Sequence, residues 1–194
     1  MNYEKLINKM KKSNGYITTS EIIEAGYTKT MIPQMIADNV IKKVAYGLYL
    51  DSDLIEDEYY ILSKRYNNII FSYNTACHLL GLSDRAPYEL DITVSFGRNM
   101  HDEHNVNIHY VNENILNLGV TEIESPYKNL IKIYNAERCI CDLLKNSNEV
   151  DIEIYNKVIK NYFKSKNKNL ILLEDYAKKI NVTEKLNNIM EVLM

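Results

Sequence analysis

The chain has 194 residues, of which 46% are hydrophobic and 25% charged, and it carries a net charge of -3. This composition is that of an ordinary globular protein and excludes a disordered or collagen-like chain. No run of residues approaches the roughly 18 apolar residues of a membrane span, and the N-terminus lacks a signal-peptide pattern. We therefore expect a soluble, cytoplasmic protein with one large domain or two small ones.

Charge is distributed unevenly along the sequence. Residues 1–50 contain seven lysines and four acidic residues, which gives this segment a net charge of +3. The remaining residues contain 16 basic and 22 acidic side chains, which gives a net charge of -6. A basic N-terminal segment on an acidic body indicates a polyanionic partner for the first fifty residues alone.

The first fifty residues begin with two predicted helices. Apolar residues recur at helical spacing in 2–12, and Gly15 follows that segment at a position that ends a helix. A second helix is expected between a cap at Thr18 or Thr19 and the glycine at Gly26. Both helices are short, as in a small helical domain.

A third helix and a hairpin are expected to complete this segment. On a helical wheel, Ile32, Met35 and Ile36 cluster on the face that would be buried. Residues 40–50 are then rich in β-branched and aromatic side chains, with a glycine placed to turn or bulge the strand. Three helices followed by a β-hairpin predict a winged helix-turn-helix domain over residues 1–50.

Pro33 constrains where the third helix begins. Proline lacks an amide hydrogen and disfavours helical geometry at the residue before it. With a cap at Thr28, Pro33 would fall beyond the first turn and delete a needed hydrogen bond. With a cap at Thr30, it becomes the third helical residue, whose amide has no partner within the helix. We therefore expect the later start or a local kink.

A winged helix would offer the outer face of its third helix to a DNA groove. Thr30 and Gln34 lie on that face, and glutamine can pair with the N6 and N7 atoms of adenine. Lysines at the start of the helix and in the wing would hold phosphates. If the segment is instead an ordinary small helical domain, these are solvent-exposed surface residues. The candidate DNA-binding residues are Thr19, Lys29, Thr30, Gln34, Lys42, Lys43 and Tyr46.

Residues 51–194 are expected to form an α+β domain with an antiparallel sheet and C-terminal helices. Strand-like patterns lie at 69–71, 90–96, 106–111, 120–125 and 130–134. Helical patterns lie at 57–66, 136–145, 151–164, 169–180 and 182–192, with one more between Ser72 and Gly81. The alternation of polar and apolar residues in 106–111 favours an antiparallel sheet with one solvated face. Segregated strands and helices disfavour a doubly wound parallel sheet.

Catalytic and metal-binding patterns are weak, so we expect no enzyme, no metal and no cofactor. The sequence contains no phosphate-binding glycine loop, no Gly-x-Ser-x-Gly motif and no His-Glu-x-x-His motif. A group of histidines and acids matches no standard metal-ligand spacing and is expected on the surface: His101, Asp102, Glu103, His104 and His109. A second set resembles a metal-dependent nuclease core only loosely, because residues 125–127 interrupt it: Glu122, Glu124 and Lys128.

The cysteines and one ion pair are expected to have structural roles. Cys77, Cys139 and Cys141 are too few and too unevenly spaced for a disulfide framework. We expect them to be reduced side chains that pack in the interior. Arg138 can bridge to Asp142 at i+4 on a helix, and we expect this pair to be a structural salt bridge.

Four stretches of the chain resemble one known family. These are Gly15 to Glu21 followed by Gly26, Val44 to Tyr49, Phe71 to Pro87 with Ile92 to Val94, and Glu137 to Leu144 with 169–177. In this order they resemble the AbiEi-type antitoxins of type IV toxin-antitoxin and abortive-infection systems, which act in phage defence. The family commonly has a basic residue before the glycine of the wing, where this chain has Tyr46.

The resemblance implies a two-domain antitoxin. Its winged helix would repress its own operon by binding double-stranded DNA at inverted repeats. Its domain of residues 51–194 would counter a nucleotidyltransferase-like toxin without needing a stable complex with it. Two alternatives remain open: a stand-alone winged-helix regulator whose C-terminal domain binds a ligand or a protein, and an enzyme that acts on nucleotides or nucleic acid. A ligand pocket lined by tyrosines would favour the regulator.

Overall fold

The computed structural model describes residues 3–98, 100, 104–147 and 150–193. They form an α+β fold that divides into two compact units. Unit 1 comprises residues 1–67 and 124–131, and unit 2 comprises residues 68–123 and 132–194. The predicted domain of residues 1–50 falls inside unit 1, which extends beyond it.

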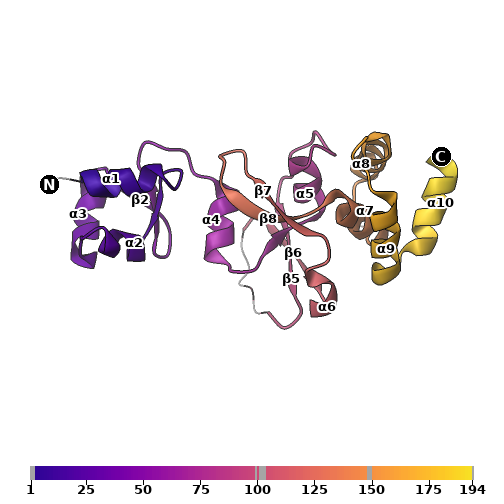
Figure 1. The fold of residues 1–194 in the computed structure, drawn as a ribbon, viewed down its shortest axis with the longest axis horizontal. Coiled ribbons are helices and arrows are strands. Elements are labelled where there is room, and N and C mark those ends of the chain that lie inside the picture. Colours follow the sequence, from indigo (N-terminus) through magenta and orange to yellow (C-terminus); the bar gives the residue numbers. More distant parts are fainter. Residues whose placement is uncertain (1–2, 99, 101–103, 148–149, 194) are drawn as a thin grey trace. The chain divides into compact units, whose positions relative to one another are not determined.

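Unit 1 combines short helices with a three-stranded sheet (Figure 1). Its elements in chain order are α1 (Glu4–Lys11), β1 (Tyr16–Thr18), α2 (Thr19–Glu24), the 3-10 turn η1 (Lys29–Met31), α3 (Ile32–Ala37), β2 (Ile41–Ala45), β3 (Leu48–Asp51) and α4 (Glu58–Arg65). The strand order is β1-β3-β2, and both pairs are antiparallel. The elements predicted for residues 1–50 are therefore present in the predicted order.

Local sequence explains the starts of the second and third helices. Thr18 caps α2: its hydroxyl accepts from the amide of Glu21, whose carboxylate accepts from the amide of Thr18. The third helix begins with η1 after Thr28 and becomes an α-helix at Ile32. Pro33 is thus the second residue of α3, where a missing amide costs no hydrogen bond. The α-helix thus starts later than a cap at Thr28 would place it, but the expected cap at Thr30 is wrong, because Thr30 lies within the 3-10 turn.

The core of unit 1 contains one face of each helix. Leu6 and Met10 of α1, Ile22 of α2 and Met35 of α3 are fully buried or nearly so. Ile36 was expected among them, but it is 40% exposed, so that prediction is wrong. Because α3 has only six residues, its buried stripe holds Ile32 and Met35, and the next residue turns away by about 100°.

Five strands form a second sheet, which is mixed and not antiparallel as expected. They are β4 (Ile70–Phe71), β5 (Leu90–Ser95), β6 (Val106–Val111), β7 (Val120–Glu124) and β8 (Leu130–Tyr134), in the order β6-β5-β4-β8-β7. β4 and β5 are antiparallel, whereas β4 with β8 and β5 with β6 are parallel. The alternation in β6 arises because it is an edge strand, while the neighbouring β5 is buried along nearly its whole length.

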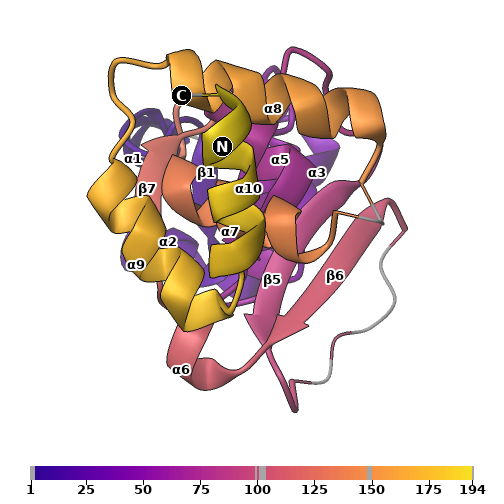
Figure 2. The ribbon, with the colours of Figure 1, turned by 90° about the vertical axis from the view of Figure 1, so that its right-hand side faces the viewer.

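The helices of unit 2 surround one buried helix (Figure 2). They are α5 (Tyr73–Leu79), α6 (Glu113–Leu116), α7 (Ala136–Lys145), α8 (Ile152–Lys164), α9 (Leu170–Ile180) and α10 (Thr183–Leu193). Every residue of α7 from Glu137 to Leu144 is buried, and α7 contacts α5, α8, α9 and α10. The long helices were predicted to within about a residue, whereas α6 was not predicted.

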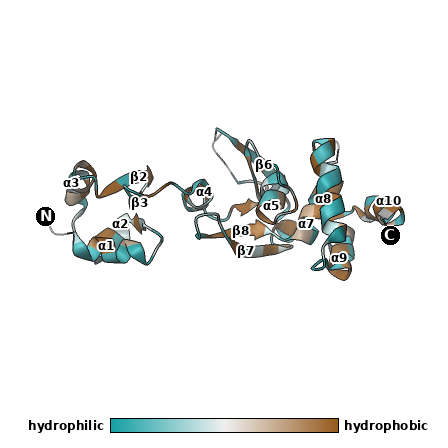
Figure 3. Cartoon of the chain, turned by 90° about the horizontal axis from the view of Figure 1, so that it is seen from above, coloured by the Kyte–Doolittle hydropathy of each residue, from teal (hydrophilic) through white to brown (hydrophobic). Residues whose placement is uncertain are grey.

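Polar caps and alternating hydropathy explain the C-terminal helices. The side chains of Asn135, Asp151 and Asn169 accept hydrogen bonds from backbone amides in the first turns of α7, α8 and α9. Hydrophilic and hydrophobic residues alternate along α8 (Figure 3), as expected for a helix with one buried side. Ser72 precedes α5, but its hydroxyl accepts from Thr93 and makes no cap.

Within the described residues, no helix combines the length and the hydrophobicity required to cross a membrane.

The cysteines are free and buried in unit 2. The thiol of Cys139 donates to the carbonyl oxygen of Tyr134 at 3.6 Å, and that of Cys141 donates to the carbonyl oxygen of Leu173 at 3.8 Å. Burial raises the pKa of the Cys141 thiol to about 12. The folded state therefore strongly favours the neutral thiol.

We expect the chain to lose stability at alkaline pH, in part through Cys141. Its pKa is about 12 in the folded state and about 9 in the unfolded state, so its contribution is complete below pH 9 and is lost as the pH rises towards 12. Urea unfolding between pH 7 and 11 measures this loss. The Cys141→Ala variant should show a shallower decline than the wild type over the same range. Identical declines would contradict the assignment.

Candidate nucleic-acid interface

The predicted recognition surface of unit 1 consists of η1, α3 and the β2–β3 hairpin. α3 buries Ile32 and Met35, which leaves Gln34 exposed on its outer side. Lys29 and Thr30 in η1 are also exposed. The structure therefore places these three candidate residues on adjoining elements, with their side chains open to solvent.

Gln34 is held in position by an acidic neighbour. Its Nε2 donates to Oδ1 of Asp38 at 2.6 Å, and Oδ2 of Asp38 accepts from the hydroxyl of Tyr3 at 2.6 Å. The hydrogen bonds from Tyr3 and Gln34 lower the pKa of Asp38, and Asp38 raises the pKa of Tyr3 to about 12. Because a carboxylate can only accept, the amide nitrogen of Gln34 must face Asp38. Oε1 and the second amide hydrogen of Gln34 remain available to a base edge.

The two candidate threonines make contacts within unit 1. The hydroxyls of Thr28 and Thr30 lie 2.7 Å apart and share a hydrogen bond. The backbone amide of Thr19 donates to the carbonyl oxygen of Gly47 at 2.9 Å, and its hydroxyl donates to the same oxygen at 3.4 Å. Thr19 thus supports the turn between β2 and β3. That turn carries Tyr46, which is 99% exposed.

The three candidate lysines differ in how far they are engaged. Lys42 donates to the carbonyl oxygen of Leu54 at 2.8 Å and lies 3.6 Å from the carboxylate of Glu56. Lys29 and Lys43 are exposed, and neither has an ion pair within the part of the chain that the structure describes. The free cations of this surface are therefore Lys29 at the start of η1 and Lys43 in β2.

A buried polar network within unit 1 was not predicted from the sequence. The carboxylate of Asp57 is completely buried and accepts from Ser125 and, at 2.7 Å, from Nδ2 of Asn129. Asp57 also caps α4, and its amide donates to the hydroxyl of Tyr16 at 2.9 Å. These contacts attach residues 124–131 to unit 1. The capping position of Asp57 was the one local signal, because contacts across about 70 residues leave no periodic pattern.

No metal cluster is present among the residues described by the structure. His101, Asp102 and Glu103 of the group considered above lie outside those residues. His104 is exposed, whereas Nε2 of His109 lies 2.8 Å from Oδ1 of Asp91.

No family model and no curated protein matches the sequence. One similar solved structure is the crystal structure of the RV2827C protein from Mycobacterium tuberculosis. The match covers 97% of this chain and 80% of that chain. The TM-score is 0.58 and the sequence identity is 10%. The likeness shows the fold alone. It supports the α+β class of the chain and assigns no role to any residue.

Proposed function

We propose that the first fifty residues form a winged helix-turn-helix domain that binds double-stranded DNA. In this proposal α3 enters the major groove and the β2–β3 hairpin is the wing. The observation that carries it is the division of α3 into a buried side with Ile32 and Met35 and an open side with Gln34. Lys29 and Lys43 supply free cations for phosphates on the adjoining elements.

We further propose that the chain is a cytoplasmic, non-enzymatic antitoxin of a type IV toxin-antitoxin system. The support is the resemblance to AbiEi-type antitoxins in both halves of the chain. The winged helix would repress the operon at inverted repeats, and residues 51–194 would counter a nucleotidyltransferase-like toxin. The acidic residues 51–194, with a net charge of -6, suit a protein partner better than a second DNA contact.

A regulator that responds to a ligand is the second candidate. The supporting observation is a polar pocket in unit 2 whose lining includes Tyr73. In that case the chain would repress transcription without any toxin partner. A nucleotidyltransferase gene beside the gene of this chain would favour the antitoxin.

Replacement of Gln34 tests base readout. We expect Gln34→Ala to weaken binding to the preferred site by about 1–3 kcal/mol, because a bidentate contact with adenine would be lost. Binding to unrelated DNA should be unchanged, since that binding depends on phosphates. Competition mobility shifts with the two DNAs measure both effects. Equal weakening on both DNAs would show that Gln34 does not read a base.

Co-expression tests the antitoxin role. The toxin gene of the same operon is induced in cells that carry the wild-type chain or an empty vector. We expect growth only with the wild-type chain. If the chain represses the operon promoter in a reporter strain but never restores growth, the regulator is correct and the antitoxin is not.

A further inference from the structure

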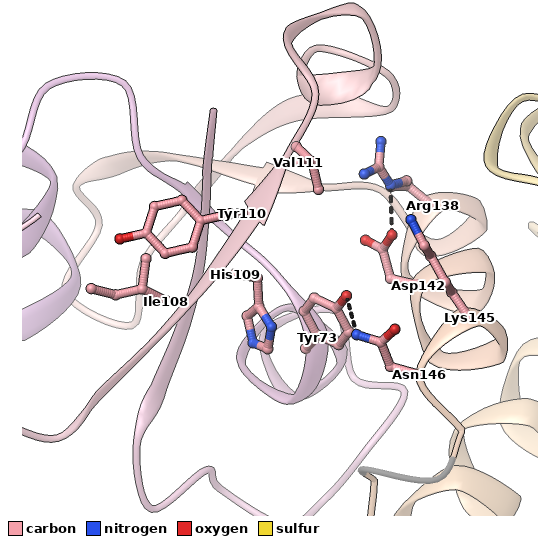
Figure 4. Close-up of a pocket in the computed structure, with 9 residues that line it drawn as sticks. All are labelled: Tyr73, Ile108, His109, Tyr110, Val111, Arg138, Asp142, Lys145 and Asn146. Atoms are coloured by element: carbon pink, nitrogen blue, oxygen red, sulfur yellow. Dashed lines mark hydrogen bonds and ion pairs between the residues drawn. The ribbon is translucent and has the colours of Figure 1, made fainter. Parts of the chain in front are cut away.

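Unit 2 contains a pocket of about 250 Å³ between β6, the start of α5 and one side of α7 (Figure 4). Its volume corresponds to about eight water molecules. This is smaller than the roughly 300–1,000 Å³ of pockets that take drug-sized ligands. The pocket therefore suits a small polar molecule.

The pocket contains a buried carboxylate oxygen that lacks a partner. The side chain of Asp142 is 4% exposed, and its Oδ1 accepts from Nε of Arg138 at 2.9 Å. Its Oδ2 is buried and accepts no hydrogen bond from any described residue. Figure 4 shows the carboxylate directed towards the open space that His109 and Tyr73 border. A buried acceptor without a donor destabilises the folded state, so a ligand that donates a hydrogen bond to this oxygen would be stabilised there.

Two cationic groups accompany this acceptor. Nη1 of Arg138 donates to the carbonyl oxygens of Ile115 and Leu118, at 2.6 and 3.0 Å. Nη2 of Arg138 makes no hydrogen bond to the residues that the structure describes. Lys145, one turn after Asp142 on α7, lines the same pocket and has no ion pair within the described part of the chain.

Ring stacking and hydrogen bonds hold the opposite wall in position. The rings of Tyr73 and His109 stack with centroids 3.8 Å apart. Nδ2 of Asn146 donates to the hydroxyl of Tyr73 at 2.9 Å, and Nε2 of His109 lies 2.8 Å from Oδ1 of Asp91. Tyr73 also has a φ of 44°, a strained conformation for a residue other than glycine. These contacts give the pocket a formed wall before any ligand binds, which reduces the cost of binding.

We propose that this pocket binds a free α-amino acid. The ammonium group would donate to Oδ2 of Asp142, and the carboxylate would accept from Nη2 of Arg138 and from Lys145. Asp142 and Arg138 are already joined through Oδ1 and Nε, so their open groups lie close together. An ammonium and a carboxylate on one carbon atom match that short spacing. A simple anion would satisfy the cations and leave Oδ2 of Asp142 unpaired.

The test is calorimetric titration of the full chain with each of the twenty standard α-amino acids. Acetate, methylamine and inorganic phosphate serve as matched probes that carry one of the two charges. We expect at least one amino acid to bind with a Kd below about 1 mM, and at least tenfold more tightly than any of the three probes. This site lies in unit 2, and the titration does not depend on DNA binding by unit 1.

Variants locate the binding in this pocket. Lys145 is exposed, so Lys145→Ala should leave the fold intact and weaken amino-acid binding about tenfold or more. Asp142→Asn should weaken it at least as much, whereas Lys179→Ala, an exposed lysine on α9, should not. Absence of binding by all twenty amino acids at 10 mM would overturn the proposal. Equally tight binding of acetate or phosphate, or unchanged binding by Lys145→Ala, would also overturn it.

Discussion

Arg138→Ala is expected to lower the free energy of unfolding by about 3–5 kcal/mol, because it leaves a buried charge without its partner. Arg138 is fully buried, pairs with Asp142 at 2.9 Å and donates to two backbone carbonyls near α6. Its guanidinium also lies 4.3 Å from the centre of the Tyr134 ring. Urea unfolding at pH 7 measures the loss.

The pH dependence of this loss identifies its cause. Burial raises the pKa of Asp142, and Arg138 opposes that rise, so the pKa of Asp142 should be higher still in Arg138→Ala. A carboxyl group whose pKa is higher in the folded state than in the unfolded state stabilises the fold at low pH. This stabilisation is lost as the pH rises. The variant should therefore be less destabilised near pH 4 than at pH 7.

Arg85 provides the matched control for Arg138. It also pairs with an aspartate, Asp151, but at 3.6 Å and with both side chains largely exposed. Arg85→Ala should change the stability little, because exposed ion pairs contribute little. Similar losses in Arg85→Ala and Arg138→Ala would contradict the structural role given to the buried pair.

The double variant Lys29→Ala/Lys43→Ala is expected to bind all DNA sequences about 60-fold more weakly at 0.1 M salt. The physical reason is the loss of two phosphate contacts, each of which releases about 0.9 counterion. The slope of log K against log salt should become shallower by about 1.8 for the same reason. Mobility shifts at several salt concentrations give both quantities.

Lys42→Ala serves as the control for the double variant. Lys42 is engaged by Leu54 and Glu56, so we expect its loss to change the salt slope by less than either of the other lysines does. If Lys42→Ala has the largest effect, the surface that contacts DNA is not the one that carries Lys29 and Lys43. Unchanged binding by the double variant would remove both lysines from the interface.

Secondary structure was largely predictable because local rules decide it. Gly26 has a positive φ angle and directly follows the C-cap of α2, as the helix-ending rule requires, whereas after α1 the positive φ falls first on Asn14 and then on Gly15. Caps at Asn135 and Asn169 mark where α7 and α9 begin. The exposure of Ile36 was missed because a helical wheel takes no account of how short a helix is.

Strand direction was not predictable from periodicity. A strand at the edge of a sheet alternates in the same way whether its neighbour is parallel or antiparallel. Val106 pairs with Leu90 and Val111 with Ser95, so β6 runs parallel to β5. Contacts between distant segments, such as that of Asp57 with Asn129, could likewise not be predicted from local sequence patterns.

The candidate sites were predictable to different degrees. The outward positions of Thr30 and Gln34 followed from helical spacing, and the structure shows both side chains exposed. The pair of Arg138 and Asp142 followed from its i+4 spacing and is present. Its complete burial and the open Oδ2 of Asp142 did not follow, because burial depends on the helices that surround α7.

We propose above all that this chain represses its own operon by binding DNA through its first fifty residues. Nuclease footprinting of the full chain on the DNA upstream of its gene tests this repression most directly. We predict protection of an inverted repeat that overlaps the promoter, and loss of that protection with Lys29→Ala/Lys43→Ala at the same protein concentration. No protected repeat at saturating protein and low salt, or equal protection by the double variant, would contradict operator binding by the first fifty residues.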